Sequence, residues 1–211
     1  MRQPKHGNRS VSYLRGTVVL LCLTSLVAQA SEDIVTGVTL FERGQFAAAQ
    51  QFFETFVSRR PTDPAGAYYL GRLAFESKQY DQALTWLEKA VQLDSGNSEY
   101  HRWLGRTYGQ QAQHAGGEAF FLARKVKIHL EKAVELNPGN IEARFDLLEY
   151  YLQAPPFLGG GSARAKEQAE EIAKHDAAAG REAWRRCEQE EAQRPGEAVT
   201  PPQPEPAGTD R

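Results

Sequence analysis

The chain has 211 residues, and its 25 Lys and Arg stand against 27 Asp and Glu, which gives a formal net charge of −2. This near-neutral, slightly acidic balance argues against sequence-independent nucleic-acid binding, because that binding depends on cations that neutralise phosphates. No nucleic-acid partner is therefore expected.

Residues 1–30 have the three parts of a secretory signal peptide. Four basic residues and no acidic residue precede or border the apolar run TVVLLCLTSLV (17–27), and AQA (28–30) follows it. Eleven apolar residues are too few to span a bilayer, which takes roughly 20. We expect cleavage after Ala30, a mature chain that begins at Ser31, a periplasmic location and no stable membrane insertion. Cleavage would leave 21 basic residues against 27 acidic ones and Cys187 as the one remaining cysteine, so no intramolecular disulfide is expected.

Between the signal and the tail, apolar residues recur at helical spacing and the pattern repeats every 34 residues. Gly37, Gly71 and Gly105 are separated by this interval, and the segment GVTLFERGQF (37–46) aligns with GRLAFESKQY (71–80). The later segment LEKAVELNPGN (130–140) is nearly identical to LEKAVQLDSGN (87–97). A period of this length is typical of helical hairpins that bury their apolar faces by stacking on one another.

On these residues the chain resembles the tetratricopeptide repeat family. In the second repeat, Leu70, Gly71, Tyr80, Ala83 and Ala90 stand at the family's positions. The resemblance implies an all-α fold, a right-handed α-solenoid of stacked helix-turn-helix hairpins. We assign repeats to 31–63, 64–97, 98–140 and 141–176, then a terminal helix at about 180–191, and a disordered tail at 192–211.

The third and fourth repeats depart from the pattern through two inserts. About nine extra residues within 109–123 separate the helices of repeat three; Gly116 and Gly117 predict a break before a long helix over 118–136. The second insert spans 153–161 and contains PPFLGGG (155–161). Repeats one and two have compact turns at the equivalent place. The prolines of the insert end one helix, and we expect Ser162 to cap the next. Phe157 and Leu158 at its tip either pack on the stack or meet a partner.

No catalytic motif is present, so the sequence predicts that the protein is not an enzyme. The adjacent glycines do not form a phosphate-binding G-x-x-x-x-G-K-[ST] loop after a strand. The histidines show neither i, i+4 pairing nor cysteine partners, so no metal and no cofactor are expected. Cys187 lies in a charged segment with no nearby histidine, and we interpret it as an inert thiol.

The resemblance implies that the first helix of each repeat lines a concave surface, where a protein or peptide partner binds. A groove of arginines and aromatic rings would suit a peptide with carboxylates, although an ordinary solvated face is an equally good interpretation. The candidate partner-binding residues are Tyr68, Arg72, Phe75, Arg102, Arg106, Phe145 and Glu149.

The sequence therefore predicts a non-catalytic scaffold or adaptor that binds an unidentified protein or peptide. One alternative is an enzyme, or an enzyme subunit, with an anion or nucleotide site built on the inserts 109–123 and 153–161. A second alternative is a structural assembly factor, with the tail or Cys187 promoting association.

Overall fold

The structure is a computed structural model that describes residues 34–193, so the predicted signal peptide and nearly all of the predicted tail lie outside the described residues. Within this range the chain is helical. Residues 34–42 form the first helix. The helices that follow it are α2 (Phe46–Arg59), α3 (Pro64–Glu76), α4 (Tyr80–Leu93), α5 (Ser98–Ala112), α6 (Ala119–Leu136), α7 (Ile141–Gln153), α8 (Ser162–His175) and α9 (Ala177–Gln193), with short 3-10 turns at Gly116–Glu118 and Pro156–Leu158.

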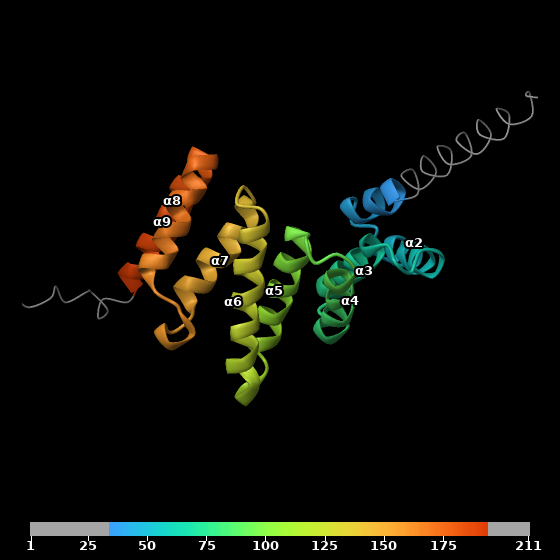
Figure 1. The fold of residues 1–211 in the computed structure, drawn as a ribbon, viewed down its shortest axis with the longest axis horizontal. Coiled ribbons are helices and arrows are strands. Elements are labelled where there is room, and N and C mark those ends of the chain that lie inside the picture. Colours follow the sequence, from blue (N-terminus) through green and yellow to red (C-terminus); the bar gives the residue numbers. More distant parts are fainter. Residues whose placement is uncertain (1–33, 194–211) are drawn as a thin grey trace, which may run out of the picture.

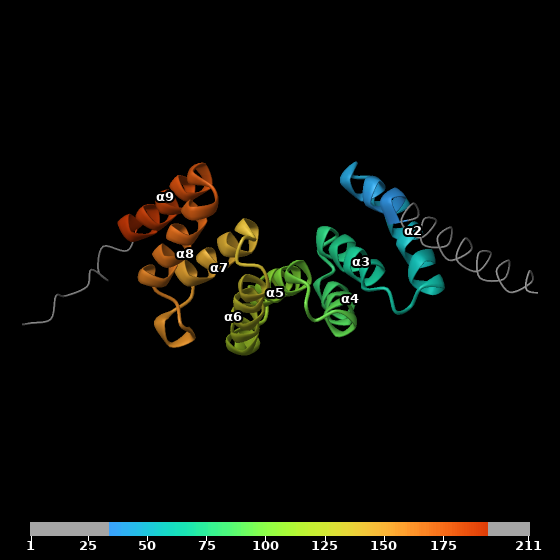
Figure 2. The same ribbon diagram turned by 45° about the horizontal axis from the view of Figure 1, so that its top comes forward.

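Consecutive helices pair into antiparallel hairpins, and the hairpins stack in a row from α2 at one end to α9 at the other (Figures 1 and 2). The predicted all-α solenoid is thereby confirmed. The stack is elongated because each hairpin contacts mainly its neighbours, as in other repeat architectures. No helix among residues 34–193 is both long and apolar enough to cross a membrane.

The first helix of each later hairpin begins at a side-chain cap. The Asp63 carboxylate accepts from the Ala65 N–H, with Pro64 as the first helical residue. Asn97 accepts from Glu99 and Tyr100, and Asn140 accepts from Ala143. These caps satisfy backbone donors that have no partner within the helix. The second helices of the first two hairpins follow turns in which Gly44 and Lys78, 34 residues apart, both have positive φ.

The glycines of the 34-residue period mark the places where paired helices cross most closely. A Cβ added at Gly71 would lie 2.6 Å from Cγ of Leu87. A Cβ at Gly37 would meet the rings of Phe52 and Phe53, and one at Gly105 would lie 2.9 Å from Cδ2 of Leu130. The same contact thus recurs in three hairpins, and the nine extra residues of repeat three do not disturb it.

The extra residues instead lengthen the third hairpin at its far end. The predicted break is confirmed by the turn at Gly116–Glu118, and the long helix α6 begins one residue later than expected. The tip of the α5–α6 hairpin and the loop between α7 and α8 lie along the same edge of the row, the lower edge in both views (Figures 1 and 2). The two inserts are therefore brought together by the fold.

The last helix covers the final repeat. Its cap is Asp176, which accepts from Ala178 and Ala179, so α9 begins three residues before the predicted start at 180. Gly180 allows it to approach Ala173 of α8, and Cys187 of α9 is fully buried on the face that packs against the stack. Burial raises the pKa of the Cys187 thiol, which keeps it protonated and unreactive.

Candidate partner-binding groove

A groove of about 620 Å³ lies between the α5–α6 hairpin, α7 and the loop 154–161. We call it the insert groove, because both inserts line it. Its volume falls within the range of ligand-binding clefts. The apolar lining comes from Phe75, Ala112, Ala119, Phe120, Ala123, Val126, Leu130, Ala154, Pro155, Phe157 and Leu158, and the polar and charged lining from Arg106, Gln110, Gln113, Asp146, Glu149, Tyr150 and Gln153.

Two aromatic rings, one from each insert, stand at the rim of the insert groove. The rings of Phe120 and Phe157 are stacked with centroids 6.3 Å apart. They are nonetheless 43% and 76% exposed. Phe157 therefore does not pack back on the stack, whereas its neighbour Leu158 packs against the core. Exposed phenyl rings beside a cleft are typical of surfaces that bind another molecule.

The glycine loop that carries Phe157 is held by backbone hydrogen bonds. The Gly161 N–H donates to Tyr151 and the Gly160 N–H to Pro155, while the Tyr150 hydroxyl donates to the Leu158 carbonyl. Gly159 has φ of 87°, and a Cβ on Gly160 would lie 1.7 Å from the Ala154 carbonyl oxygen. Only glycine fits these positions. These hydrogen bonds and glycine conformations define a turn that places Phe157 at the rim of the insert groove.

The expectation that Ser162 caps α8 is wrong. The cap position is Gly161, with φ of 147°, and no side chain accepts a hydrogen bond there. Ser162 is the first helical residue, and its hydroxyl instead bonds to Glu191 of α9. Lys166 first, and then this hydroxyl, lower the pKa of the Glu191 carboxyl. The glycine run moves the helix start by one residue, because Gly161 adopts a backbone conformation that serine rarely adopts.

The predicted partner-binding residues divide into two sets. Phe75, Arg106 and Glu149 line the insert groove. The groove lining does not include Tyr68, Arg72, Arg102 or Phe145. Both arginines of this set have partners within the protein.

Arg102 is buried, and three carboxylates surround its guanidinium. Its Nε donates to Asp146 at 2.7 Å, Nη2 to Glu142 at 3.0 Å and Nη1 to Glu99 at 3.2 Å. Burial raises the pKa of Asp146 against the opposing effect of Arg102 and Arg106. Arg102 thus joins α5 to α7, and its hydrogen-bonding capacity is largely used within the protein.

Arg72 lies between aromatic rings. Its guanidinium carbon is 4.4 Å from the centroid of Phe41 and 4.3 Å from that of Trp103, and Nη1 donates to the Tyr68 hydroxyl at 3.4 Å. Arg106 also lies over Trp103, at 4.4 Å. Such cation–π contacts hold both arginines in place. Burial raises the pKa of Tyr68 to about 12, so its hydroxyl stays protonated.

At the carboxyl-terminal end of the stack, Arg186 of α9 contacts the two predicted residues of α7. Its guanidinium lies 4.9 Å from the ring centroid of Phe145, and Nη1 donates to Glu149 at 2.7 Å. Phe145 is partly buried against the core. Glu149 therefore contributes an ion-paired carboxylate, rather than a free one, to the insert groove.

A histidine pair that the sequence did not predict lies inside the third hairpin. His101 Nε2 is 3.2 Å from the Ser95 carbonyl oxygen, so this nitrogen donates. Its Nδ1 then accepts from His129 Nδ1 at 3.1 Å. Burial lowers the pKa of both rings, and burial together with the neighbouring His101 lowers that of His129 to about 4. Among residues 34–193, no three potential metal ligands group together.

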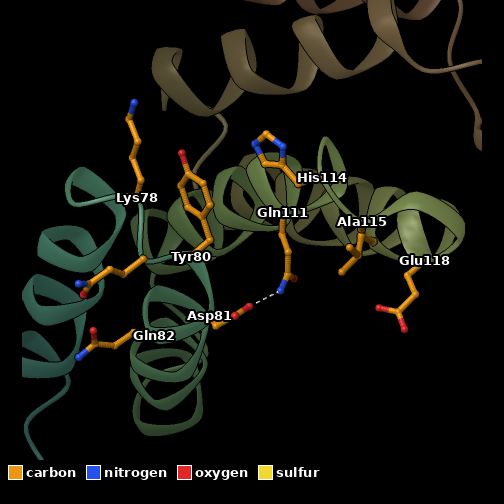
Figure 3. Close-up of a pocket in the computed structure, with 10 residues that line it drawn as sticks. Lys78, Tyr80, Asp81, Gln82, Gln111, His114, Ala115 and Glu118 are labelled. Carbon is orange, nitrogen blue, oxygen red and sulfur yellow. Dashed lines mark hydrogen bonds between the residues drawn. The ribbon is translucent and has the colours of Figure 1, made fainter.

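A second hollow, of about 580 Å³, lies on the other side of the lengthened hairpin tip (Figure 3). It lies between the start of α4 and the end of α5, and most of the residues that line it are polar or charged. Gln111 donates to Asp81 at 2.7 Å across it, and His114 and Glu118 come from the insert (Figure 3). It has no exposed aromatic pair, so the insert groove is the stronger candidate.

The insert groove could not be located from spacing alone. Its outward signals were the two departures from the 34-residue period and the apolar pairs at 120–121 and 157–158. The pairing of Phe120 with Phe157 depends on the lengths of both inserts. No short-range rule relates residues 37 positions apart.

The fold and the groove define a class: a helical-hairpin solenoid whose neighbouring hairpins form a recessed surface. Residues 40–120 match the family model described as tetratricopeptide repeat. Residues 40–120 are therefore tetratricopeptide repeats. No curated protein sequence matches it significantly.

Several solved structures share the fold. YrrB, described as a TPR protein with an unusual peptide-binding site, is 18% identical, with 82% of this chain and 84% of YrrB covered and a TM-score of 0.59. TTC0263, a thermophilic TPR protein from Thermus thermophilus, is 17% identical, with coverage of 77% and 88% and a TM-score of 0.60. A mutant O-GlcNAc transferase from Thermobaculum terrenum is 21% identical, with coverage of 70% and 26% and a TM-score of 0.58.

Proposed function

We propose that the protein is a non-catalytic scaffold that binds an extended segment of a partner protein in the insert groove, after export to the periplasm. The observation that carries this proposal is the exposure of Phe120 and Phe157 at the rim of a mostly apolar cleft. Covering two phenyl rings gives a favourable hydrophobic contribution, and aromatic residues are enriched among the side chains that dominate binding.

The polar lining also suits a peptide. The side-chain amides of Gln110, Gln113 and Gln153 offer donors and acceptors for a peptide backbone. The description of YrrB as having a peptide-binding site supports the same class of ligand. A nucleotide is less well served, because the one cation of the lining, Arg106, faces Asp146 at 3.9 Å.

Selection of peptides from a random displayed library on the full chain tests this function. We expect enrichment of peptides with apolar or aromatic residues. Phe157→Ala should weaken their binding about tenfold or more, measured by isothermal titration calorimetry, since truncation of an aromatic side chain that dominates binding typically costs about 2 kcal/mol. Phe157 is largely exposed, so this substitution leaves the fold intact.

Phe121→Ala is the matched control. Phe121 lies next to Phe120 on α6 and is 65% exposed, but it does not line the insert groove. Its replacement should leave the affinity unchanged. No enrichment, or equal binding to the wild type and Phe157→Ala, would refute peptide binding in this groove.

The export part of the proposal rests on the basic and apolar segments of residues 1–30 and on AQA at 28–30. N-terminal sequencing of the protein from the periplasmic fraction of a bacterial host tests it. The expected first residue is Ser31. Protein that keeps Met1 and stays with the cytoplasmic fraction would contradict export.

A further inference from the structure

The described chain ends beside the start of α8, which directly follows the loop of the insert groove. Lys166 of α8 and Glu191 of α9 form an ion pair at 2.7 Å, and Ser162 also bonds to Glu191. The last turn of α9 is thereby held against the first turn of α8. That turn directly follows the loop whose Pro155, Phe157 and Leu158 line the groove.

The segment beyond α9 has a composition that matches this surface. Residues 194–211 read RPGEAVTPPQPEPAGTDR, with five prolines in 18 residues. Proline-rich segments favour the polyproline II conformation, which docks in aromatic-lined grooves at a low cost in conformational entropy. We propose that the segment 194–211 of the same chain occupies the insert groove and competes there with the partner. This inference rests on the proposed function, since it assigns a second ligand to the same site.

The hydrogen-bonding groups of the insert groove fit a proline-rich occupant. Proline carbonyls accept but proline has no N–H to donate, so the occupant needs donors from the groove more than acceptors. Gln110, Gln113 and Gln153 supply amide donors. The groove carboxylates are already paired, Asp146 with Arg102 and Glu149 with Arg186.

The loop adds positive charge beside the groove. A Cβ on Gly159 would lie 2.7 Å from Nζ of Lys127 and 2.8 Å from Nη1 of Arg164, so both cations lie against the loop. Lys127 is 3.7 Å from the exposed Glu131 carboxylate, and Arg164 donates to the Gly159 carbonyl oxygen, which leaves each cation with further donors. The segment carries Glu205 between two prolines. A carboxylate in the middle of the proline run therefore has cations within reach when the run lies across the loop.

Length permits this docking within one molecule. Eighteen residues span at most about 60 Å when extended, and the segment follows the end of α9 that contacts Ser162 and Lys166 at the start of α8. Tethering gives an effective concentration on the order of millimolar. Even a weak intrinsic affinity then keeps the groove largely occupied.

Site-specific photocrosslinking in the full chain tests the proposal. With p-benzoylphenylalanine in place of Phe157, illumination at low micromolar protein should join position 157 to residues 199–206 of the same molecule, as read by mass spectrometry. Replacing Phe121 in the same way is the matched control, since Phe121 lies outside the groove, and should give little of this product. A crosslink from 157 only to a second copy, or none to the segment, would overturn the proposal.

The second measurement is competition. The triple variant Pro201→Ala, Pro202→Ala, Pro204→Ala should lower the crosslink yield and should bind a library-selected peptide about threefold to fivefold more tightly than the wild type. Unchanged affinity together with an unchanged crosslink would overturn the proposal. If library peptides bind through Phe157 but position 157 never reaches the segment, the proposed function stands and only this inference fails.

Discussion

Arg102 shows how a charged side chain that the sequence assigned to a partner surface is used inside the protein. Its side chain is 10% exposed, and its guanidinium contacts Glu99, Glu142 and Asp146. Two of these carboxylates, Glu142 and Asp146, belong to α7 and are 40 and 44 positions away in the sequence. Sequence spacing gave no information about the carboxylates opposite Arg102. Simultaneous replacement of Arg72, Arg102 and Arg106 would therefore test stability as much as binding.

Arg102→Ala should destabilise the fold strongly. It leaves Asp146 in a partly buried site, with Arg106 at 3.9 Å as its nearest remaining cation, and breaking such a pair costs about 3 kcal/mol. Urea unfolding followed by circular dichroism measures this loss. Arg185→Ala is the control, because Arg185 pairs with Glu182 on the exposed surface of α9 and should cost less than about 1 kcal/mol. Equal losses for both variants would show that Arg102 is not structural.

The histidine pair makes stability depend on pH. His129 has its pKa lowered to about 4 in the folded protein, against an ordinary value of 6.5. Below pH 6.5 the unfolded chain therefore binds a proton that the folded chain does not bind until about pH 4. The resulting stability is complete above pH 6.5 and is lost as the pH falls through this window.

The expected result is a lower free energy of unfolding at pH 5 than at pH 7. His129→Gln should reduce this difference, measured by urea unfolding at both pH values. Comparison with the variant separates the imidazole from buried carboxyls such as Asp146, whose raised pKa acts with the opposite sign. The same slope in both proteins would exclude His129 as its cause.

At the scale of helices, the position of each element follows from local signals except where glycine or an uncommon cap intervenes. Three helices begin at caps of the residue types that typically mark helix starts in a sequence: Asp63, Asn97 and Asn140. Because serine commonly caps helices, the sequence predicts Ser162 as the cap of α8, yet Gly161 occupies that position. The early start of α9 follows from Asp176, whose carboxylate competes well for backbone N–H groups.

Gly71→Ala should destabilise the protein although alanine favours helices. The new methyl would lie 2.6 Å from the side chain and 3.2 Å from the backbone nitrogen of Leu87, which is fully buried. Overpacking of this kind costs about 1–3 kcal/mol. Gly109→Ala, where the nearest atom is 3.9 Å away, should instead be neutral or stabilise by up to about 1 kcal/mol. Thermal unfolding of both variants checks the contrast, and an equal effect would remove the close crossing as its cause.

For the whole molecule, stacking divides the core into two clusters along the row. One joins Phe41, Phe53 and Phe56 to Leu70 and Leu73 at the amino-terminal end, and the other runs from α3 to α9. In such an array each hairpin is stabilised mainly by its neighbours. Damage at one end is therefore expected to remain local.

Hydrogen exchange tests this expectation with two reciprocal variants. Phe53→Ala should speed exchange in residues 34–76 and leave α7 and α8 nearly unchanged. Ile172→Ala should do the reverse, since Ile172 is fully buried in the last repeat. Each removes a large buried side chain and costs about 2–5 kcal/mol. Faster exchange along the whole chain in both variants would show one cooperative unit instead.

The sequence by itself determined the architecture of this protein. A 34-residue period of apolar residues with glycines at Gly37, Gly71 and Gly105 allows few solutions other than stacked hairpins, because helix periodicity and close crossing are local properties. Only the tertiary structure decided which inserts meet, that Phe120 and Phe157 form one rim, and that Arg102 is enclosed while Arg106 borders a groove. These outcomes depend on how helices tens of residues apart in sequence cross in space, and no local pattern encodes that geometry.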